Sequence, residues 1–156
     1  MNHRLECIGC GARYSSSDIL YFCKTCGDLL EVRYDYEELR KSVDISVARS
    51  RPLSVWRYEE LLPLDKTSAK ISLGEGGTSL QRSIRLSQNL RLRSLYIKNE
   101  GENPTGSFKD RGMTIGVSKA VDIGARRVAC ASTGNTSASL AAYAARAGIE
   151  CIVVIP

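Results

Sequence analysis

The stretch NPTGSFKDRG at residues 103–112 organises the second half of the chain around Lys109. Asn-Pro followed by Thr-Gly predicts a tight turn, because proline fixes its φ and glycine adopts angles that other residues avoid. A helix can begin directly after the turn, with Ser107 as N-cap and Lys109 in the first turn. The helix dipole and partial burial would both disfavour the ammonium form of Lys109 and favour a nucleophilic amine. The alternative is an exposed lysine that opens a surface helix.

Outward from this turn, the pattern predicts alternating strands and helices. Apolar residues recur at helical spacing after Lys109, at Met113, Val117, Ala120 and Val121. Gly124 is a suitable end for that helix, and Gly112 and Gly116 would let it pack closely against a neighbour. Further elements are predicted as strands at residues 95–100, 128–131 and 150–155, the last two buried, and an alanine-rich helix at residues 137–147. This order predicts an α/β fold with a parallel sheet and flanking helices.

Residues 132–136, with the sequence STGNT, join a predicted strand to the alanine-rich helix. Small hydroxyl residues, a glycine and an asparagine at a helix N-terminus suit an anion such as a carboxylate or a phosphate. A capped turn without a ligand is the alternative. Ligands collect at the carboxyl ends of parallel strands, so we expect this loop and Lys109 to lie at one edge of the sheet. Cys130 and Cys151 are interpreted as core residues.

The decapeptide at residues 103–112 resembles the cofactor-lysine motif of threonine synthases, which are pyridoxal-phosphate (PLP) enzymes of the tryptophan-synthase-β-like fold. The resemblance implies that Lys109 is catalytic, holds PLP as a Schiff base and then moves protons between carbons. It also implies that Phe108 and Asn135 bind the cofactor, with Asn135 at its 3-oxygen. The residues implied to bind the substrate carboxylate are Ser132, Thr133, Gly134 and Thr136.

The implied reaction converts O-phospho-L-homoserine and water to L-threonine and phosphate. Two alternatives stay open: β-replacement on O-phosphoserine, as in the similar cysteate synthases, and an inert zinc-ribbon binding module that carries an enzyme remnant. In this family, the groups that hold the PLP phosphate and the pyridine nitrogen come from beyond the alanine-rich helix. We therefore expect that this chain is the N-terminal part of a longer polypeptide and that it is inactive alone. A homodimer is one assembly that the full-length protein could form.

Two Cys-x2-Cys pairs separated by twelve residues predict a zinc ribbon over residues 1–34. The predicted metal ligands are Cys7, Cys10, Cys23 and Cys26. Residues 19–22 and 29–34 can supply strands, and the aromatic residues Tyr14, Tyr21, Phe22 and Tyr34 are interpreted as a small core in preference to an RNA-binding surface. Four reduced structural cysteines without a metal are the alternative.

Residues 35–70 are interpreted as a linker and N-terminal arm, with short helices at residues 36–41 and 56–63, and residues 71–156 as the beginning of the PLP-dependent domain. The role of the glycine-rich run GEGGTS at residues 74–79 stays open. The net charge of +5 is spread along the chain, which favours small anionic ligands over nucleic acid. No apolar run of 18 residues and no hydrophobic leader is present, so we expect a cytoplasmic protein without a membrane partner.

Overall fold

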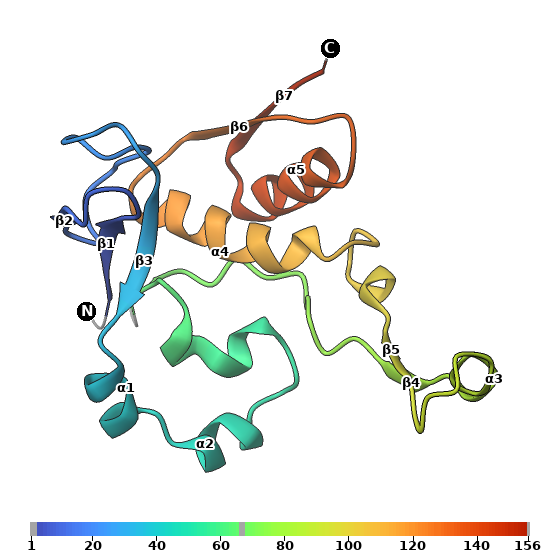
Figure 1. Cartoon of the computed structure of the whole chain (residues 1–156). Helices are drawn as coiled ribbons and strands as arrows, with labels where there is room; N and C mark the ends of the chain where they lie inside the picture. The colour runs from blue at the N-terminus through green and yellow to red at the C-terminus, as the bar shows by residue number, and fades with distance from the viewer. Residues whose placement is uncertain (1–2, 66–67, 156) are drawn as a thin grey trace. The chain divides into compact units, whose positions relative to one another are not determined.

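The computed structural model describes residues 3–65 and 68–155 (Figure 1). It divides into two compact units: one holds the chain up to Pro52 together with Arg57–Ser68, and the other holds Leu53–Trp56 and the chain from Ala69 onward. In the described residues, no helix has both the length and the apolar character that a membrane span requires. The secondary structure is a mixture of short helices and small sheets, as the predicted α/β class requires.

The first unit contains a three-stranded antiparallel sheet in which β1 (His3–Cys7) lies between β2 (Arg13–Tyr14) and β3 (Leu30–Tyr34). The strand predicted at residues 29–34 is confirmed as β3. The strand predicted at residues 19–22 is wrong, because β2 and β3 already occupy both edges of β1. Tyr21 and Phe22 are 82% and 60% exposed, so their interpretation as core residues is also wrong.

Short helices follow this sheet. The helix predicted at residues 36–41 is confirmed as α1 (Tyr36–Ser42), which Asp35 caps through hydrogen bonds from two backbone amides. An unpredicted helix, α2 (Ile45–Ser50), begins after the cap residue Asp44. The helix predicted at residues 56–63 is a 3₁₀ segment, η1 (Val55–Leu61), with a non-helical residue at Tyr58. The division of the chain near residues 34 and 70 stays a prediction.

The second unit begins with β4 (Leu80–Arg82), α3 (Ile84–Asn89), β5 (Tyr96–Lys98) and η2 (Glu100–Glu102). The strand predicted at residues 95–100 exists as β5, but it pairs antiparallel with β4 and does not join the parallel sheet. The short α3 connection returns the chain beside β4, and all residues of both strands are exposed. β5 therefore has no buried face of the kind that a central parallel strand needs.

The remaining elements are α4 (Lys109–Asp122), β6 (Arg127–Ala131), α5 (Asn135–Ala147) and β7 (Glu150–Val154). β6 and β7 pair in parallel, with Val128 opposite Cys151, which confirms the predicted parallel crossover for this part. Gly148 ends α5 in the left-handed conformation. β6 alternates between exposed and half-buried positions, and in β7 only Cys151 is half-buried, so the prediction of fully buried strands is wrong. Half-burial follows because the core lies against one face, where α5 contacts both strands.

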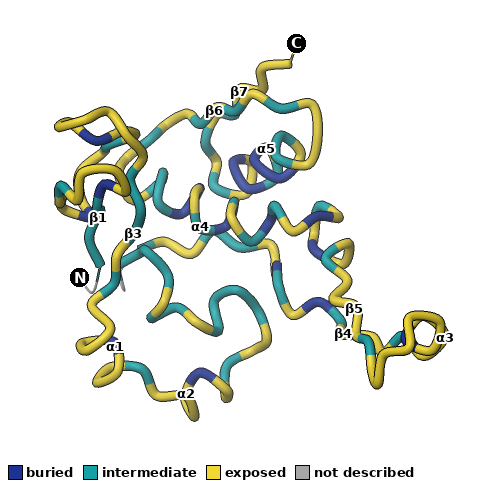
Figure 2. Tube along the Cα trace, in the orientation of Figure 1, coloured by how far each residue is buried: buried dark blue, intermediate teal, exposed yellow. Residues whose placement is uncertain are grey.

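The core of the second unit lies between α4, α5 and the parallel strands (Figure 2). Its buried apolar residues are Val117, Leu140 and Tyr143, with Met113, Cys130 and Cys151 among the partly buried residues around them. This arrangement confirms the core position of Met113 and Val117 and of the two cysteines.

One face of α4 is buried but polar, because Asp110, Thr114 and Ser118 are each fully buried at four-residue spacing. Gly112 and Gly116 are exposed, and a Cβ added at either would meet no atom within 4 Å. Their predicted role in close packing is therefore wrong. The sequence pattern identified the apolar side of α4 and missed the polar one.

Candidate functional site

Lys109 is the first residue of α4 and follows a tight turn. The amide of Gly106, whose φ is 76°, donates to the carbonyl of Asn103 at 2.8 Å. Phe108 occupies the N-cap position, and the predicted cap Ser107 instead accepts the Lys109 amide at 3.2 Å through its Oγ. The prediction that Lys109 lies in the first helical turn is confirmed, whereas the predicted cap position is one residue off.

The side chain of Lys109 is half-buried, and its Nζ lies 4.6 Å from the centroid of the Phe108 ring. The ring itself is 57% exposed. Among the described residues, no carboxylate and no hydrogen-bond acceptor holds this Nζ. The amine therefore has an aromatic neighbour but no ionic partner that an incoming group would have to displace.

Asp110, next to Lys109, is fully buried and accepts three hydrogen bonds. Thr105 donates from its amide at 2.7 Å and from its hydroxyl at 2.5 Å, and Ser139 in α5 donates from its hydroxyl at 2.5 Å. Asn135 lies one turn before Ser139 on the same face of α5. The two predicted parts of the site, Lys109 and the loop at residues 132–136, therefore stand at neighbouring helix N-termini (Figure 1).

The shared sheet edge that the sequence predicted for these two parts is wrong. Ser132 does follow β6 at its carboxyl end, as expected, but β5 belongs to a different sheet. Contact between α4 and α5 brings Lys109 toward the loop, and the buried carboxylate of Asp110 provides the polar part of that contact.

The loop at residues 132–136 leads into α5, which begins without a side-chain cap. Ser132 accepts the Gly134 amide at 3.2 Å, and the Ser137 hydroxyl donates to the Ser132 carbonyl. Thr133, Gly134 and Asn135 are exposed. An uncapped helix N-terminus with exposed hydroxyl and amide groups is suited to an anion.

A second network supports the turn from behind. Arg111 forms an ion pair with Glu100 at 2.7 Å, and Glu100 also accepts from Thr78 and Asn103. Hydrogen bonding to Arg111 is the largest effect that lowers the pKa of Glu100, to about 2. Lys98 donates to the carbonyl of Thr78. Arg111 and Lys98 are thus engaged inside the scaffold.

The glycine-rich run at residues 74–79 holds a buried carboxylate, that of Glu75. Its donors include the indole of Trp56 at 3.1 Å, the amide of Leu73 at 2.9 Å and the hydroxyl of Tyr143 at 2.6 Å. Burial raises the pKa of Glu75, but these hydrogen bonds outweigh it, and the net pKa is lowered. The run therefore packs against α4 and α5. Sequence reasoning missed the structural roles of Glu75, Asp110 and Ser139. The signal in the sequence was a polar residue between glycines for Glu75, and a polar residue within a predicted helix for Asp110 and Ser139.

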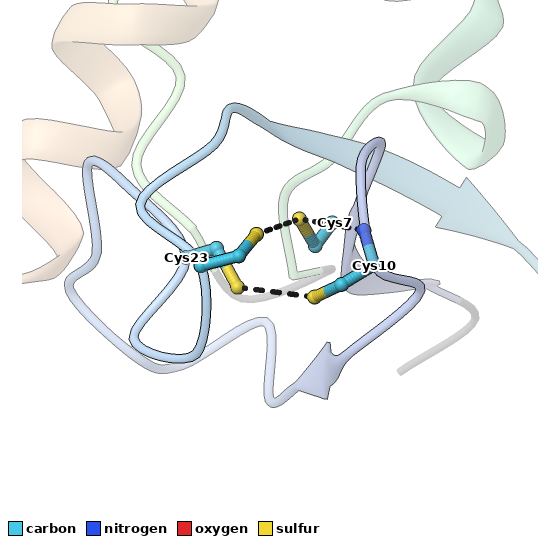
Figure 3. Close-up of side chains that lie close together, drawn as sticks. Cys7, Cys10 and Cys23 are labelled. Carbon is cyan, nitrogen blue, oxygen red and sulfur yellow. Dashed lines mark hydrogen bonds between the residues drawn. The ribbon is translucent and has the colours of Figure 1, made fainter.

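The four predicted metal ligands lie together in the first unit (Figure 3). Their sulfur atoms are all within 4.8 Å of one another, with Cys7 3.5 Å from Cys26 and Cys10 3.6 Å from Cys23. Four sulfurs about 2.3 Å from a tetrahedral ion are about 3.8 Å apart, so the cluster matches the size of a four-thiolate metal site. Its spacing agrees with the prediction from the two Cys-x2-Cys pairs.

The charges of this cluster also suit a cation. The Tyr14 hydroxyl, 3.1 Å from the Cys23 sulfur, is the main group that lowers the pKa of Cys23, to about 5. The Asp28 amide lowers the pKa of Cys26, but the sulfurs of Cys7 and Cys10 outweigh it and raise that pKa to about 12. Formation of the Cys23 thiolate is favoured, whereas formation of a thiolate at Cys26 is opposed by the neighbouring sulfurs. A divalent metal removes this repulsion between thiolates.

Comparison with known proteins places the second unit in a family. A family profile described as "Pyridoxal-phosphate dependent enzyme" matches residues 71–156, more than half of the chain. Threonine synthase of Methanocaldococcus jannaschii is 55% identical over 97% of this chain, and threonine synthase of Methanosarcina acetivorans is 48% identical over 99%. Threonine synthase of Halalkalibacterium halodurans is 52% identical over 67% of this chain and 30% of its own length. The chain spans 37% of the length of the first two relatives. On the match over residues 71–156, the chain belongs to the family of pyridoxal-phosphate dependent enzymes.

Proposed function

We propose that this chain forms part of a threonine synthase, which converts O-phospho-L-homoserine and water to L-threonine and phosphate. The observation that carries the proposal is the placement of Lys109 at the N-terminus of α4, joined through Asp110 and Ser139 to the uncapped N-terminus of α5. A primary amine and an anion-binding loop are what an amino-acid substrate and an aldehyde cofactor need. The names of the relatives support the same activity.

Lys109 is the proposed catalytic residue and cofactor attachment point. Its amine fits the aldehyde of PLP because no ion pair in the described chain occupies it, and because the exposed Phe108 ring offers an apolar surface 4.6 Å away. When bound, PLP supplies an electron sink that stabilises negative charge at the substrate carbons. The side chain of Lys109 then takes a proton from one carbon and returns it at another.

The loop before α5 is the proposed binding site for the substrate carboxylate and for one edge of the cofactor. Exposed hydroxyl groups and helix amides can donate to a carboxylate, and the helix dipole favours its charge. The residues that we assign to the carboxylate are Ser132, Thr133, Gly134 and Thr136, and we assign Asn135 and Phe108 to the cofactor. A Cβ at Gly134 would meet no atom within 4 Å, so the space beside this backbone is open to a ligand.

Zinc is the proposed metal of the four-cysteine cluster, and its role is structural. Four thiolates leave no coordination position for water or substrate, which is typical of structural zinc. One pair of cysteines lies at the end of β1 and just after it, and the other pair lies in the loop before β3. A metal would therefore connect two segments of a unit that has few buried apolar side chains. Zinc would then stabilise the first unit without taking part in the chemistry at Lys109.

The test uses the full-length protein with two substrates. Phosphate release and threonine formation from O-phospho-L-homoserine are expected, and replacement products from O-phospho-L-serine are not. Lys109→Ala should abolish threonine formation and the visible absorbance of lysine-bound PLP. Lys119→Ala changes the same residue type in the last turn of α4 and should retain both.

Each contrary result points to one alternative. Replacement products from O-phospho-L-serine without threonine would assign a β-replacement enzyme. A protein that takes up zinc but shows no PLP absorbance and no response to Lys109→Ala would be an inert module with an enzyme remnant.

A further inference from the structure

We propose that Asp110 is a positioning residue, whose buried carboxylate fixes the backbone of Lys109 against the second turn of α5 by accepting hydrogen bonds from Thr105 and Ser139. The inference rests on the proposed role of Lys109 and assigns a function to residues outside the cofactor and substrate sets. It concerns how the amine is aimed at the loop where the substrate would bind.

The burial of the Asp110 carboxylate is costly in free energy. Asp110 has no exposed surface, and burying a carboxylate is unfavourable unless donors surround it. Three donors from two residues do so, at 2.5 to 2.7 Å, and the position in the first turn of α4 adds the favourable end of the helix dipole. An apolar contact between α4 and α5 would hold the helices together without that burial cost. A carboxylate instead imposes direction, since each hydrogen bond constrains an angle as well as a distance.

The hydrogen bonds around Asp110 constrain the backbone on both sides of Lys109. The Thr105 amide and hydroxyl tie the turn before Lys109 to the residue after it, and the Lys109 amide is itself held by Ser107. The backbone of Lys109 is thus fixed on both sides. The long side chain keeps its freedom, so the position of its Cα decides where the amine can reach.

The carboxylate of Asp110 also connects α4 to α5. Ser139 donates to the same carboxylate oxygen, Oδ1, that accepts the Thr105 hydroxyl. One atom therefore sets the turn that carries Lys109 and the helix that carries Asn135. Within the described part of the chain, the other buried polar contacts of α4, at Thr114 and Ser118, are to Trp56 and Ile71. They reach α5 indirectly, through Trp56 and Glu75 to Tyr143, far from Lys109 along α4.

A matched pair of serines separates positioning from stability. Ser139→Ala removes the link between the helix N-termini, whereas Ser118→Ala removes an equally buried hydroxyl that accepts the Ile71 amide at 2.9 Å. Ser118 lies eight residues beyond Asp110, about 12 Å along α4. A second pair tests the turn: Thr105→Val removes the hydroxyl at nearly constant shape, and Thr105→Ser keeps it.

The first measurement needs no substrate. Full-length apo-protein is mixed with pyridoxal 5′-phosphate, whose aldehyde condenses with the Lys109 amine with loss of water. Borohydride then reduces the C=N bond to a stable amine that mass spectrometry locates. Ser139→Ala and Thr105→Val should slow this labelling at Lys109 and shift the pH midpoint of the visible absorbance of bound cofactor. Ser118→Ala should do neither, and Thr105→Ser should restore what Thr105→Val loses.

The second measurement is turnover with O-phospho-L-homoserine. Ser139→Ala should lower kcat about tenfold to a hundredfold, the usual effect of misplacing a catalytic group by up to 1 Å, while KM changes much less. The proposal is overturned when Ser139→Ala and Thr105→Val match Ser118→Ala in labelling rate and pH midpoint, or when Thr105→Ser is as impaired as Thr105→Val. Failure of wild-type protein to label at Lys109 would instead overturn the proposed function itself.

Discussion

The hydroxyl of Tyr143 in α5 donates a 2.6 Å hydrogen bond to the carboxylate of Glu75, and neither side chain has exposed surface. Trp56 donates to both Glu75 and Thr114, so the same cluster reaches α4. Burial and the hydrogen bond to Glu75 both raise the pKa of Tyr143, which keeps its proton available for donation. The glycine-rich run and both helices of the candidate site therefore meet at one carboxylate.

Tyr143→Phe should destabilise the second unit. The substitution keeps the ring and leaves a buried carboxylate with one donor fewer, which costs about 1.5–3 kcal/mol for a hydrogen bond to a charged group. Urea unfolding followed by circular dichroism measures the change. Tyr96→Phe makes the same change at a residue that is 53% exposed and should alter stability by less than about 0.5 kcal/mol. Equal effects of the two substitutions would show that Glu75 does not depend on Tyr143.

Glu100 should make stability depend on pH in acid. Its carboxyl pKa lies at about 2 in the folded protein, below the ordinary value of 4.5, chiefly because of the hydrogen bond from Arg111. A lowered folded pKa contributes stability above the ordinary value, and that stability is lost as pH falls from about 4.5 to about 2. Glu100→Gln should therefore be less stable than wild type at pH 7 by about 1–2 kcal/mol, a value discounted because the ion pair is partly exposed.

The measurement is the difference in unfolding free energy between wild type and Glu100→Gln at several pH values. Loss of a metal in acid would affect both proteins and would cancel from this difference. The difference should shrink as pH falls below 4.5. A difference that stays constant down to pH 2 would contradict the assignment.

The sequence predicted the local structure around the candidate site well and its connections poorly. Three features depend mainly on residues close together in the sequence, and a pattern of residue types therefore predicts them. They are the turn at Gly106, the start of α4 at Lys109 and the cysteine cluster. The partner of β5 was mispredicted, because pairing depends on which strand edge is available in space. The residues of β5 are exposed, which an antiparallel sheet tolerates and a central parallel strand does not, but that exposure follows from the fold and is not visible in the sequence pattern.

Buried polar residues were missed for a related reason. The periodicity of apolar side chains predicts the position of Val117 correctly, in the core. Asp110, Thr114 and Ser118 share the four-residue spacing of a buried face, but their burial is favourable only because Ser139, Trp56 and Ile71 supply partners from other segments. The sequence alone does not show which residues of other segments will become those partners.

Tyr14→Phe should weaken metal binding by the first unit. The Tyr14 hydroxyl lies 3.1 Å from the Cys23 sulfur, which as a metal-bound thiolate can only accept a hydrogen bond from it. Partners that orient a metal ligand typically contribute tenfold to a hundredfold in affinity. A competition titration of zinc against a chromophoric chelator measures the dissociation constant. Tyr21→Phe is the control, since Tyr21 is 82% exposed. Cys7→Ser should lower the metal content more than Tyr14→Phe or Tyr21→Phe, and the reaction of Lys109 with pyridoxal phosphate should persist. Unchanged zinc affinity in Tyr14→Phe would show that the hydroxyl does not orient Cys23.

Two glycine-to-alanine substitutions should change stability in opposite directions. Gly77 has a φ of 65°, and a Cβ there would lie 2.2 Å from the carbonyl oxygen of Leu53. Alanine at this position combines a left-handed backbone, which costs of order 1–3 kcal/mol, with a clash against main chain that cannot rotate away. Gly116 lies on the exposed face of α4 with no atom within 4 Å of an added Cβ, so Gly116→Ala should stabilise the helix by about 0.5–1 kcal/mol. Thermal unfolding of the two variants separates them, because the substitution is the same and only the surroundings differ. A stabilised Gly77→Ala would mean that the glycine-rich run can move away from Leu53, and the close contact between these two segments would then not be part of the folded state.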